Sequence, residues 1–244
     1  MTDRSVPLLS ALDLRYRYGA FEALRGVSLN LGAGELAALV GRNGAGKSTL
    51  LRCLAGWYQV EAGSVRSGPA QNAAPCRVVL VPDTPSFYAE LTAWEHLQFI
   101  SQLHGRVSWQ AEAGQLLKAL GLKGHERAYA SSFSRGMQYK LALAVALLSR
   151  PEVLLLDEPF GPLDALSSEA LYGELRRFAA EGRAVLVSAH QMPQAVAPDR
   201  FLLLENGELL VDAAAEELMQ RYDLPAIHGE DLLRAALSEG SEEL

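Results

Sequence analysis

The amino-acid sequence predicts a layered α/β domain that carries a helical insertion. Three observations support this fold class. Short apolar runs with strand composition alternate with helical patterns, a glycine-rich loop joins one such run to a helix, and strand signals are missing from residues 88–150. Of the 244 residues, 49% are hydrophobic, which is ample for the core of one large domain. We therefore expect one globular unit.

Six apolar runs are expected to form β-strands. Residues 154–156 and 184–187 have no polar face, which is typical of central strands covered by helices on both sides. The expected strands are 27–31, 36–40, 78–81, 153–156, 185–188 and 201–204. Residues 63–75 are rich in Gly, Ser, Pro and Asn, so we expect a surface turn there and no strand.

A glycine-rich loop matches the phosphate-binding pattern G-x-x-x-x-G-K-[S/T]. It consists of Gly41, Arg42, Asn43, Gly44, Ala45, Gly46, Lys47, Ser48 and Thr49. The loop follows an apolar strand and precedes a helical pattern, so its backbone N–H groups and the helix dipole can both face an anion. Lys47 is expected to reach the outer phosphates and Ser48 to hold Mg²⁺. This loop predicts a binding site for a nucleoside triphosphate.

The insertion is expected to contain three helices. Residues 92–95 form a capping box before Leu97, and further helical patterns cover residues 111–120 and 135–149. Its longest uninterrupted apolar run, 141–148, is much shorter than the roughly 20 residues that span a bilayer. Because Met1 to Arg4 do not open a signal peptide, we expect a cytosolic protein.

Acidic residues are concentrated near the C-terminus. The net charge is −7; residues 212–244 carry nine acidic and two basic side chains, which leaves 20 of each in residues 1–211. This balance argues against a large basic surface for nucleic acid. We expect the tail, with helical patterns around 214–221 and 230–237, to be a solvated appendage. Cys53 and Cys76 lack the spacing of a metal or redox site, so we assign them no function.

Two carboxylates follow the apolar run at 153–156. Asp157 is positioned to hold Mg²⁺, directly or through water, and Glu158 to orient and partly deprotonate an attacking water. An Asp-Glu pair alone is often a helix cap or a turn. Its position downstream of a complete phosphate loop favours the catalytic interpretation.

A third motif, Ser134-Arg135-Gly136-Met137-Gln138, opens a helix rich in Ala and Leu. Alone it is also compatible with an ordinary Ser-capped helix. Ahead of the Asp157–Glu158 strand, however, it resembles the Leu-Ser-Gly-Gly-Gln signature of the ATP-binding cassette (ABC) family, with Arg135 where the first signature glycine usually stands. The resemblance extends from about Leu12 to Val211. It implies a P-loop NTPase core of ABC ATPase type with an inserted helical subdomain and an N-terminal antiparallel β portion.

The resemblance also implies roles for individual residues. Ser134 and Gly136 resemble the groups that bind the γ-phosphate held by the other subunit, Asp164 belongs to a loop that crosses the dimer interface, and His190 resembles the switch histidine. Tyr18 resembles the aromatic that stacks on adenine, with Tyr16 as the rival. The expected catalytic residues are Lys47, Glu158 and His190. Nucleotide contacts are expected from Tyr18, Gly41, Asn43, Gly44, Ala45, Gly46, Lys47, Ser48, Thr49, Asp83, Ser134, Gly136, Gln138 and Asp164, and Mg²⁺ ligation from Ser48, Asp157 and Asp83.

One position departs from the family pattern with consequences for the chemistry. The family usually has Gln after the strand at 78–81 and a Pro, whereas this chain has Asp83. Asp is one methylene shorter and negatively charged, so we expect it to act on Mg²⁺ through a bridging water.

The resemblance implies an ATPase that uses ATP and Mg²⁺ and forms a homodimer or a heterodimer with another cassette. Its membrane permease would be a separate chain, which would place the protein at the cytoplasmic face of the membrane. The form Ser-Arg-Gly-Met resembles cassettes of exporters. A soluble ABC-type ATPase of translation, repair or cluster assembly and an unrelated GTPase or kinase are the alternatives, and a nucleic-acid partner is not expected.

Domain boundaries follow from the same resemblance. We expect a core of about 1–87 and 151–211, a helical signature subdomain of about 88–150 and an acidic tail of about 212–244. The family receives a permease helix in a groove at the start of the insertion, where this chain has an aromatic cluster. Trp94, Leu97 and Phe99 are expected to pack in the subdomain core, whereas Phe87 and Tyr88 are candidates for an interface.

Overall fold

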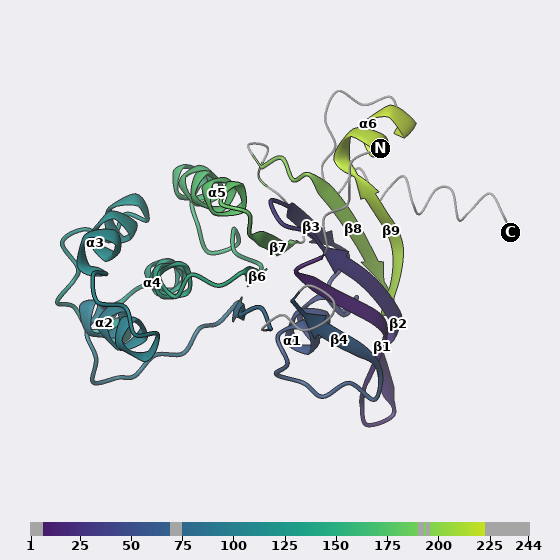
Figure 1. Ribbon diagram of the computed structural model, residues 1–244, viewed down its shortest axis with the longest axis horizontal. Helices are drawn as coiled ribbons and strands as arrows, with labels where there is room; N and C mark the ends of the chain where they lie inside the picture. The colour runs from purple at the N-terminus through teal and green to yellow at the C-terminus, as the bar shows by residue number, and fades with distance from the viewer. Residues whose placement is uncertain (1–6, 69–74, 190–192, 194–195, 223–244) are drawn as a thin grey trace, which may run out of the picture.

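The computed structural model describes residues 7–68, 75–189, 193 and 196–222. It confirms the α/β class: two sheets lie beside a group of helices (Figure 1). The strands are β1 (Leu9–Tyr18), β2 (Phe21–Leu31), β3 (Leu36–Val40), β4 (Ala62–Ser67), β5 (Val78–Val81), β6 (Val153–Asp157), β7 (Ala184–Ala189), β8 (Arg200–Glu205) and β9 (Glu208–Ala214). The helices are α1 (Lys47–Leu54), α2 (Ala93–Leu103), α3 (Gln110–Ala119), η1 (Ala130–Ser132), α4 (Arg135–Leu148), α5 (Ala165–Ala180) and α6 (Ala215–Tyr222).

The larger sheet has the order β5-β6-β7-β3-β8-β9, and all its strands except β9 run parallel. Its central strands β3, β6 and β7 are buried along their whole length, as their continuous apolar sequences predict. Side chains of β6 alternate between two cores: Leu154 and Leu156 face the helical side, whereas Val153 and Leu155 face α1 and the smaller sheet. Parallel pairing brings the carboxyl ends of β5, β6, β7 and β3 to one edge.

The smaller sheet is antiparallel, with the order β2-β1-β4. It confirms the expected N-terminal β portion. The expectation of a turn without a strand at residues 63–75 is wrong for its first part, because β4 pairs with β1 there. Gly63 explains the misleading sequence signal. It has φ +88°, and a side chain on it would meet the backbone oxygen of Asp13 at 2.3 Å, so the glycine permits close packing at an irregularity in the ladder.

Strand β9 is a second element that the apolar runs do not predict. It alternates exposed and half-buried residues and pairs with β8 through a two-residue turn, Asn206-Gly207, in which both residues have positive φ. The segment expected to be a weakly docked tail therefore starts inside the sheet. It continues into α6, whose Leu218 is buried against β8. The expected helix at 230–237 lies outside the described residues.

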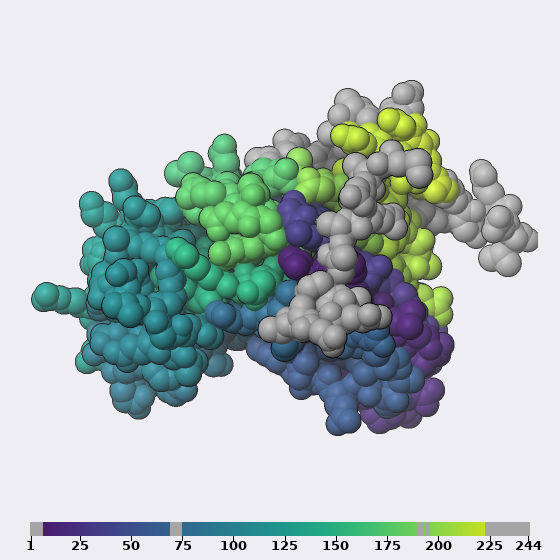
Figure 2. All heavy atoms as spheres, viewed as in Figure 1, coloured from purple at the N-terminus to yellow at the C-terminus, as the bar shows by residue number. Residues whose placement is uncertain are grey.

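The helical insertion forms one lobe beside the sheets (Figure 2). Its first helix begins with the expected capping box: Thr92 Oγ1 accepts from the Glu95 amide at 3.3 Å, and Glu95 accepts from the Thr92 amide at 2.8 Å. Trp94 packs on Trp109 with ring centroids 5.0 Å apart. Within the described residues, no helix is long and apolar enough to cross a bilayer.

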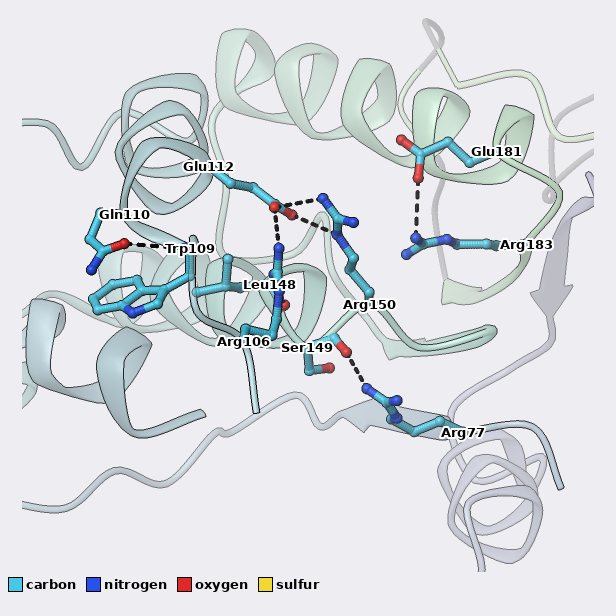
Figure 3. Close-up of polar contacts among 10 residues, drawn as sticks. All are labelled: Arg77, Arg106, Trp109, Gln110, Glu112, Leu148, Ser149, Arg150, Glu181 and Arg183. Carbon is cyan, nitrogen blue, oxygen red and sulfur yellow. Dashed lines mark hydrogen bonds and ion pairs between the residues drawn. The ribbon is translucent and has the colours of Figure 1, made fainter. Parts of the chain in front are cut away.

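Arginine side chains fix the C-terminal end of α4 (Figure 3). Arg106 and Arg77 donate to the last carbonyls of the helix, those of Leu148 and Ser149. The Glu112 carboxylate of α3 forms ion pairs with Arg106 and Arg150, and the distance to Arg150 is 2.7 Å. Unpaired helix carbonyls attract cations, so these contacts both cap α4 and bind it to α3 and to the core strand that Arg77 precedes.

Candidate functional site

The phosphate loop leaves β3 and closes onto α1, which begins at Lys47. Gly46 has φ +108°, and a side chain there would lie 2.7 Å from the carbonyl oxygen of Ala23, so glycine is required. Behind the loop, the turn between β8 and β9 supports it, because the Gly207 amide donates to the Ala45 carbonyl at 3.0 Å. The first amides of α1 are thereby held at the sheet edge where an anion can bind.

Lys47 is 6% exposed and lies inside this loop. Its Nζ donates to the Gly41 carbonyl at 2.9 Å and lies 3.4 Å from Glu158 Oε1. The phosphate-loop lysine and the predicted catalytic carboxylate are thus already paired. The positive charge of Lys47 and the negative charge of Glu158 compensate each other in a poorly solvated site.

Asp157 and Glu158 are held by one hydroxyl group on the neighbouring strand. Ser188 Oγ donates to Asp157 Oδ1 at 2.7 Å and accepts from the Glu158 amide at 3.0 Å. Glu158 has φ +49°, a conformation that costs a non-glycine residue on the order of 1 kcal/mol or more. This backbone bend directs the Glu158 side chain toward Lys47 and away from the line of the buried strand.

Two tyrosines compete for the role of adenine platform, and they differ in environment. Tyr18 is 44% exposed, and its hydroxyl lies 3.3 Å from Thr49 Oγ1 on the first turn of α1. Tyr16 is half-buried and stacks on Tyr58 with centroids 5.0 Å apart and ring planes 10° apart. The exposed ring of Tyr18 is available to a base, whereas Tyr16 is engaged in the core.

The third motif lies at the N-terminus of α4. Ser134 is exposed and caps the helix, because its Oγ accepts from the Met137 amide at 3.3 Å. A side chain at Gly136 would meet the Pro162 carbonyl at 2.8 Å, so glycine lets α4 approach the loop before α5. Gln138 points the other way and donates to the Ala130 carbonyl at 3.1 Å. In this conformation Gln138 contacts its own subdomain.

Asp83 and Arg135, which both depart from the usual motifs, contact each other. Arg135 donates to Asp83 Oδ1 at 2.7 Å, and the two side chains are 65% and 43% exposed. Asp83 follows β5 and Arg135 is the first residue of α4, so the ion pair joins the sheet edge to the helical lobe.

The remaining predicted positions lie as follows. Asp164 caps α5 by accepting from the Ser167 amide at 2.7 Å, and this hydrogen bond lowers the pKa of Asp164. In the phosphate loop, Asn43 and Gly44 are exposed, Ser48 is half-buried and Thr49 is buried. His190 lies outside the described residues. The sheet edge therefore brings Lys47, Glu158 and Asp157 together, and α4 presents Ser134 and Gly136 from the other lobe.

A comparison with protein families decides the assignment. The model of the ABC transporter family matches residues 24–161, which include the phosphate loop, α4 and Glu158. The chain belongs to this family. As an ABC ATPase, it binds ATP and hydrolyses it to ADP and phosphate.

Relatives of this ABC ATPase align with it along most or nearly all of the chain. It is 35% identical to the aliphatic sulfonates import ATP-binding protein SsuB of Pseudomonas putida, with 98% of this chain and 89% of the relative covered. It is also 35% identical to the uncharacterized ABC transporter ATP-binding protein YthP of Bacillus subtilis, with 87% of each chain covered. The solved structure of an ATP-binding subunit of an ABC transporter superposes with a TM-score of 0.83 at 27% identity, covering 94% of this chain and 99% of the other.

Sequence reasoning about this ABC ATPase missed two residues that support the site. Ser188 is the single hydroxyl at the end of an apolar strand, which is a detectable signal because a buried polar group needs a partner. Tyr139 is fully buried in α4 and donates to the Asp157 carbonyl at 3.3 Å. Burial raises the pKa of Tyr139, and the nearby charges of Asp157, Asp83 and Glu158 raise it further.

Proposed function

We propose that this chain is the subunit that hydrolyses ATP to drive a separate membrane permease, and that ATP is bound between two cassettes. The observation that carries the proposal is the division of the site between two lobes. Lys47 and Glu158 meet at the sheet edge, whereas Ser134 caps an exposed helix N-terminus in the insertion. An exposed helix N-terminus suits an anion that a second protein brings.

Within one cassette, the roles follow from chemistry and burial. Amides of the phosphate loop and Lys47 bind the β- and γ-phosphates, and Tyr18 stacks on adenine. The ligands that Mg²⁺ prefers are oxygens, which Ser48 and Asp157 would supply. When bound there, Mg²⁺ neutralises charge on the phosphates.

Hydrolysis requires a base that is released at the right time. Lys47 Nζ lies 3.4 Å from Glu158 Oε1. Phosphate oxygens compete for Lys47, and its transfer to them weakens this ion pair, so that the carboxylate of Glu158 orients and deprotonates water. Ser134 and Gly136 of the second cassette then stabilise the γ-phosphate from the opposite side.

Substitution of Glu158 by Gln tests the division of the site. Glu158→Gln keeps the size of the side chain but removes its basicity, so ATP should bind while hydrolysis stalls and a dimer accumulates in light scattering. Adding Ser134→Arg should abolish the dimer and leave ATP binding by the monomer intact. Lys47→Ala is the control for the phosphate site and should abolish turnover. A Glu158→Gln protein that stays monomeric with ATP and its permease would contradict the shared site.

Export was predicted from the form of the signature, and the named relatives give it no support. SsuB of Pseudomonas putida is named as an importer of aliphatic sulfonates. Because the permease contacts the cargo, direction is tested by reconstituting this subunit with the permease of a neighbouring reading frame. ATP-dependent movement of cargo out of or into the vesicles then assigns the direction, and failure to purify with any membrane protein would favour a soluble ABC-type ATPase.

A further inference from the structure

The N-terminal half of α4 contacts the catalytic sheet edge at two places on one face of the helix. Arg135 bonds Asp83 after β5, and Tyr139, four residues later, bonds the carbonyl of Asp157 at the end of β6. Residues separated by four positions lie above one another on a helix. The signature helix is therefore joined to both strands whose ends carry the site.

These two contacts differ in how easily they can change. Tyr139 is fully buried, whereas Arg135 and Asp83 are 65% and 43% exposed. At its other end, α4 is fixed by Arg77, by Arg106 and by the Glu112 network, in which Arg106 is only 16% exposed (Figure 3). The Asp83–Arg135 pair is thus the adjustable link between α4 and the sheet edge.

The pair also balances charge beside the phosphate sites. Arg135 directly follows Ser134 at the positive end of the α4 dipole, and Asp83 follows β5 at the sheet edge. An unpaired Asp83 would add negative charge where triphosphate binds. An unpaired Arg135 would rotate freely at the surface that meets the second cassette.

We propose that Asp83 and Arg135 form a positioning pair that holds the signature helix against the sheet edge and thereby sets how readily ATP closes the two-cassette site. The inference rests on the proposed shared site. In this chain an ion pair joins two positions at which the family usually has a neutral glutamine and a glycine. Arg135 acts in this way without touching the reacting atoms.

A double-mutant cycle tests the pair in the full-length protein. Asp83→Asn, Arg135→Gln and the double variant are made in the wild type and in the Glu158→Gln protein. Each single variant should raise the ATP concentration for half-maximal dimer formation about two- to fivefold, the range expected for an exposed ion pair. The double variant should do no worse than the poorer single variant, because the link is already lost. Binding of ATP to the monomer should be unchanged in Arg135→Gln, because Arg135 is not among the expected nucleotide contacts.

Two controls separate positioning from general damage. Asp83→Glu keeps the carboxylate and should restore most of the wild-type response. Arg177→Gln removes another exposed arginine, which pairs with Glu174 at 3.1 Å on α5, and should cause no shift. High salt should move the wild type toward the variants, since exposed charges are screened.

The inference would be overturned if the fold-changes of the two single variants multiplied in the double variant. It would also be overturned if Arg177→Gln shifted the half-maximal ATP concentration as much as Arg135→Gln does. If the Glu158→Gln parent forms no dimer, the shared site fails. In that case the same variants are made in the wild-type background, and the ATP concentration for half-maximal hydrolysis is measured. The effects of the two single variants must again be non-additive for the inference to hold.

Discussion

Lys47 occupies the loop that it is predicted to serve. Its ammonium group is bound by the Gly41 carbonyl and by Glu158, so it is pre-placed beside the phosphate position at 6% exposure. Ordering a lysine side chain costs rotamer entropy, and in this protein the side chain is already ordered by folding. Under the proposed mechanism, the same contact engages the Glu158 carboxylate until phosphate competes for the cation.

The two tyrosines of β1 lead to opposite predictions. Tyr18→Ala should weaken ATP binding by about 1–3 kcal/mol, because an exposed ring available for stacking is lost. Tyr16→Ala should instead lower the free energy of unfolding, since its ring stacks on Tyr58 in the core. Binding titrations and denaturant melts measure the two effects. Tyr18→Phe, which keeps the ring and loses the hydroxyl contacts with Thr49 and Arg52, should bind ATP nearly as the wild type does. The reverse order of the alanine variants would assign adenine stacking to Tyr16.

Gly136 is predicted to be indispensable for packing as well as for phosphate binding. Gly136→Ala would place a methyl group 2.8 Å from the Pro162 carbonyl, so α4 must shift, and we expect a loss of about 1–3 kcal/mol in stability. Gly173→Ala is the matched control, because α5 has open space there among the described residues. That control should gain about 0.5–1 kcal/mol from helix propensity. Thermal unfolding measures both, and equal gains would contradict the close approach.

At the scale of elements, α4 is held from both ends, and its C-terminal end depends on charge. Although burial raises the pKa of Glu112, the hydrogen bonds and charges of Arg106 and Arg150 lower it below the ordinary value. Because the folded pKa lies below the unfolded one, the stabilisation is complete above the ordinary glutamate pKa. It is lost as the pH falls through the folded pKa.

Substitution of Glu112 by Gln should therefore destabilise the protein near neutral pH and much less in acid. We expect a loss of about 1 kcal/mol at pH 7, discounted for the partial exposure of the network. The difference from wild type should shrink below about pH 4, because both proteins then carry an uncharged side chain there. Urea unfolding at several pH values measures it, with Glu169→Gln on the exposed face of α5 as control. A pH-independent difference would show that the charge is not responsible.

At the scale of the molecule, the start of the insertion presents an apolar surface. Tyr88 is 59% exposed and lies against Phe99, with ring centroids 5.7 Å apart, and Phe99 is 46% exposed. Leu97 and Trp94 pack in the lobe as expected, but Phe99 does not, because α2 turns it outward. Phe87 is half-buried against the same core. The candidate interface therefore contains Tyr88 and Phe99, and Phe87 supports it from below.

Tyr88→Ala combined with Phe99→Ala should leave the ATPase folded and able to bind ATP but reduce its co-purification with a membrane permease. Exposed aromatic side chains are the usual anchors of interfaces, which is the physical reason for the loss. Leu12→Ala, at an exposed apolar side chain on β1, is the matched control and should co-purify at the wild-type yield. Unchanged recovery of the permease by the double variant would place the docking surface elsewhere.

Local chemistry in the sequence determined the fold class, the six apolar strands and the nucleotide chemistry. The phosphate loop, the capping box at Thr92 and the Asp157–Glu158 pair depend on neighbours along the chain, so their residue types and spacing identify them. Strands β1, β4 and β9 were not found, because polar and charged residues interrupt their apolar positions and β4 also contains Gly63. The Asn206-Gly207 turn was the available signal for β9.

Contacts between distant segments were decided only by the tertiary structure. Ser188 lies 31 positions from Asp157, and Arg135 lies 52 positions from Asp83. Pairing of parallel strands and the packing of α4 on their ends bring these groups together, and no local pattern records either event. The sequence thus determined the family chemistry and the candidate groups of this ATPase, whereas the fold determined which of them constrain one another, because side-chain distances across a sheet edge depend on the whole core.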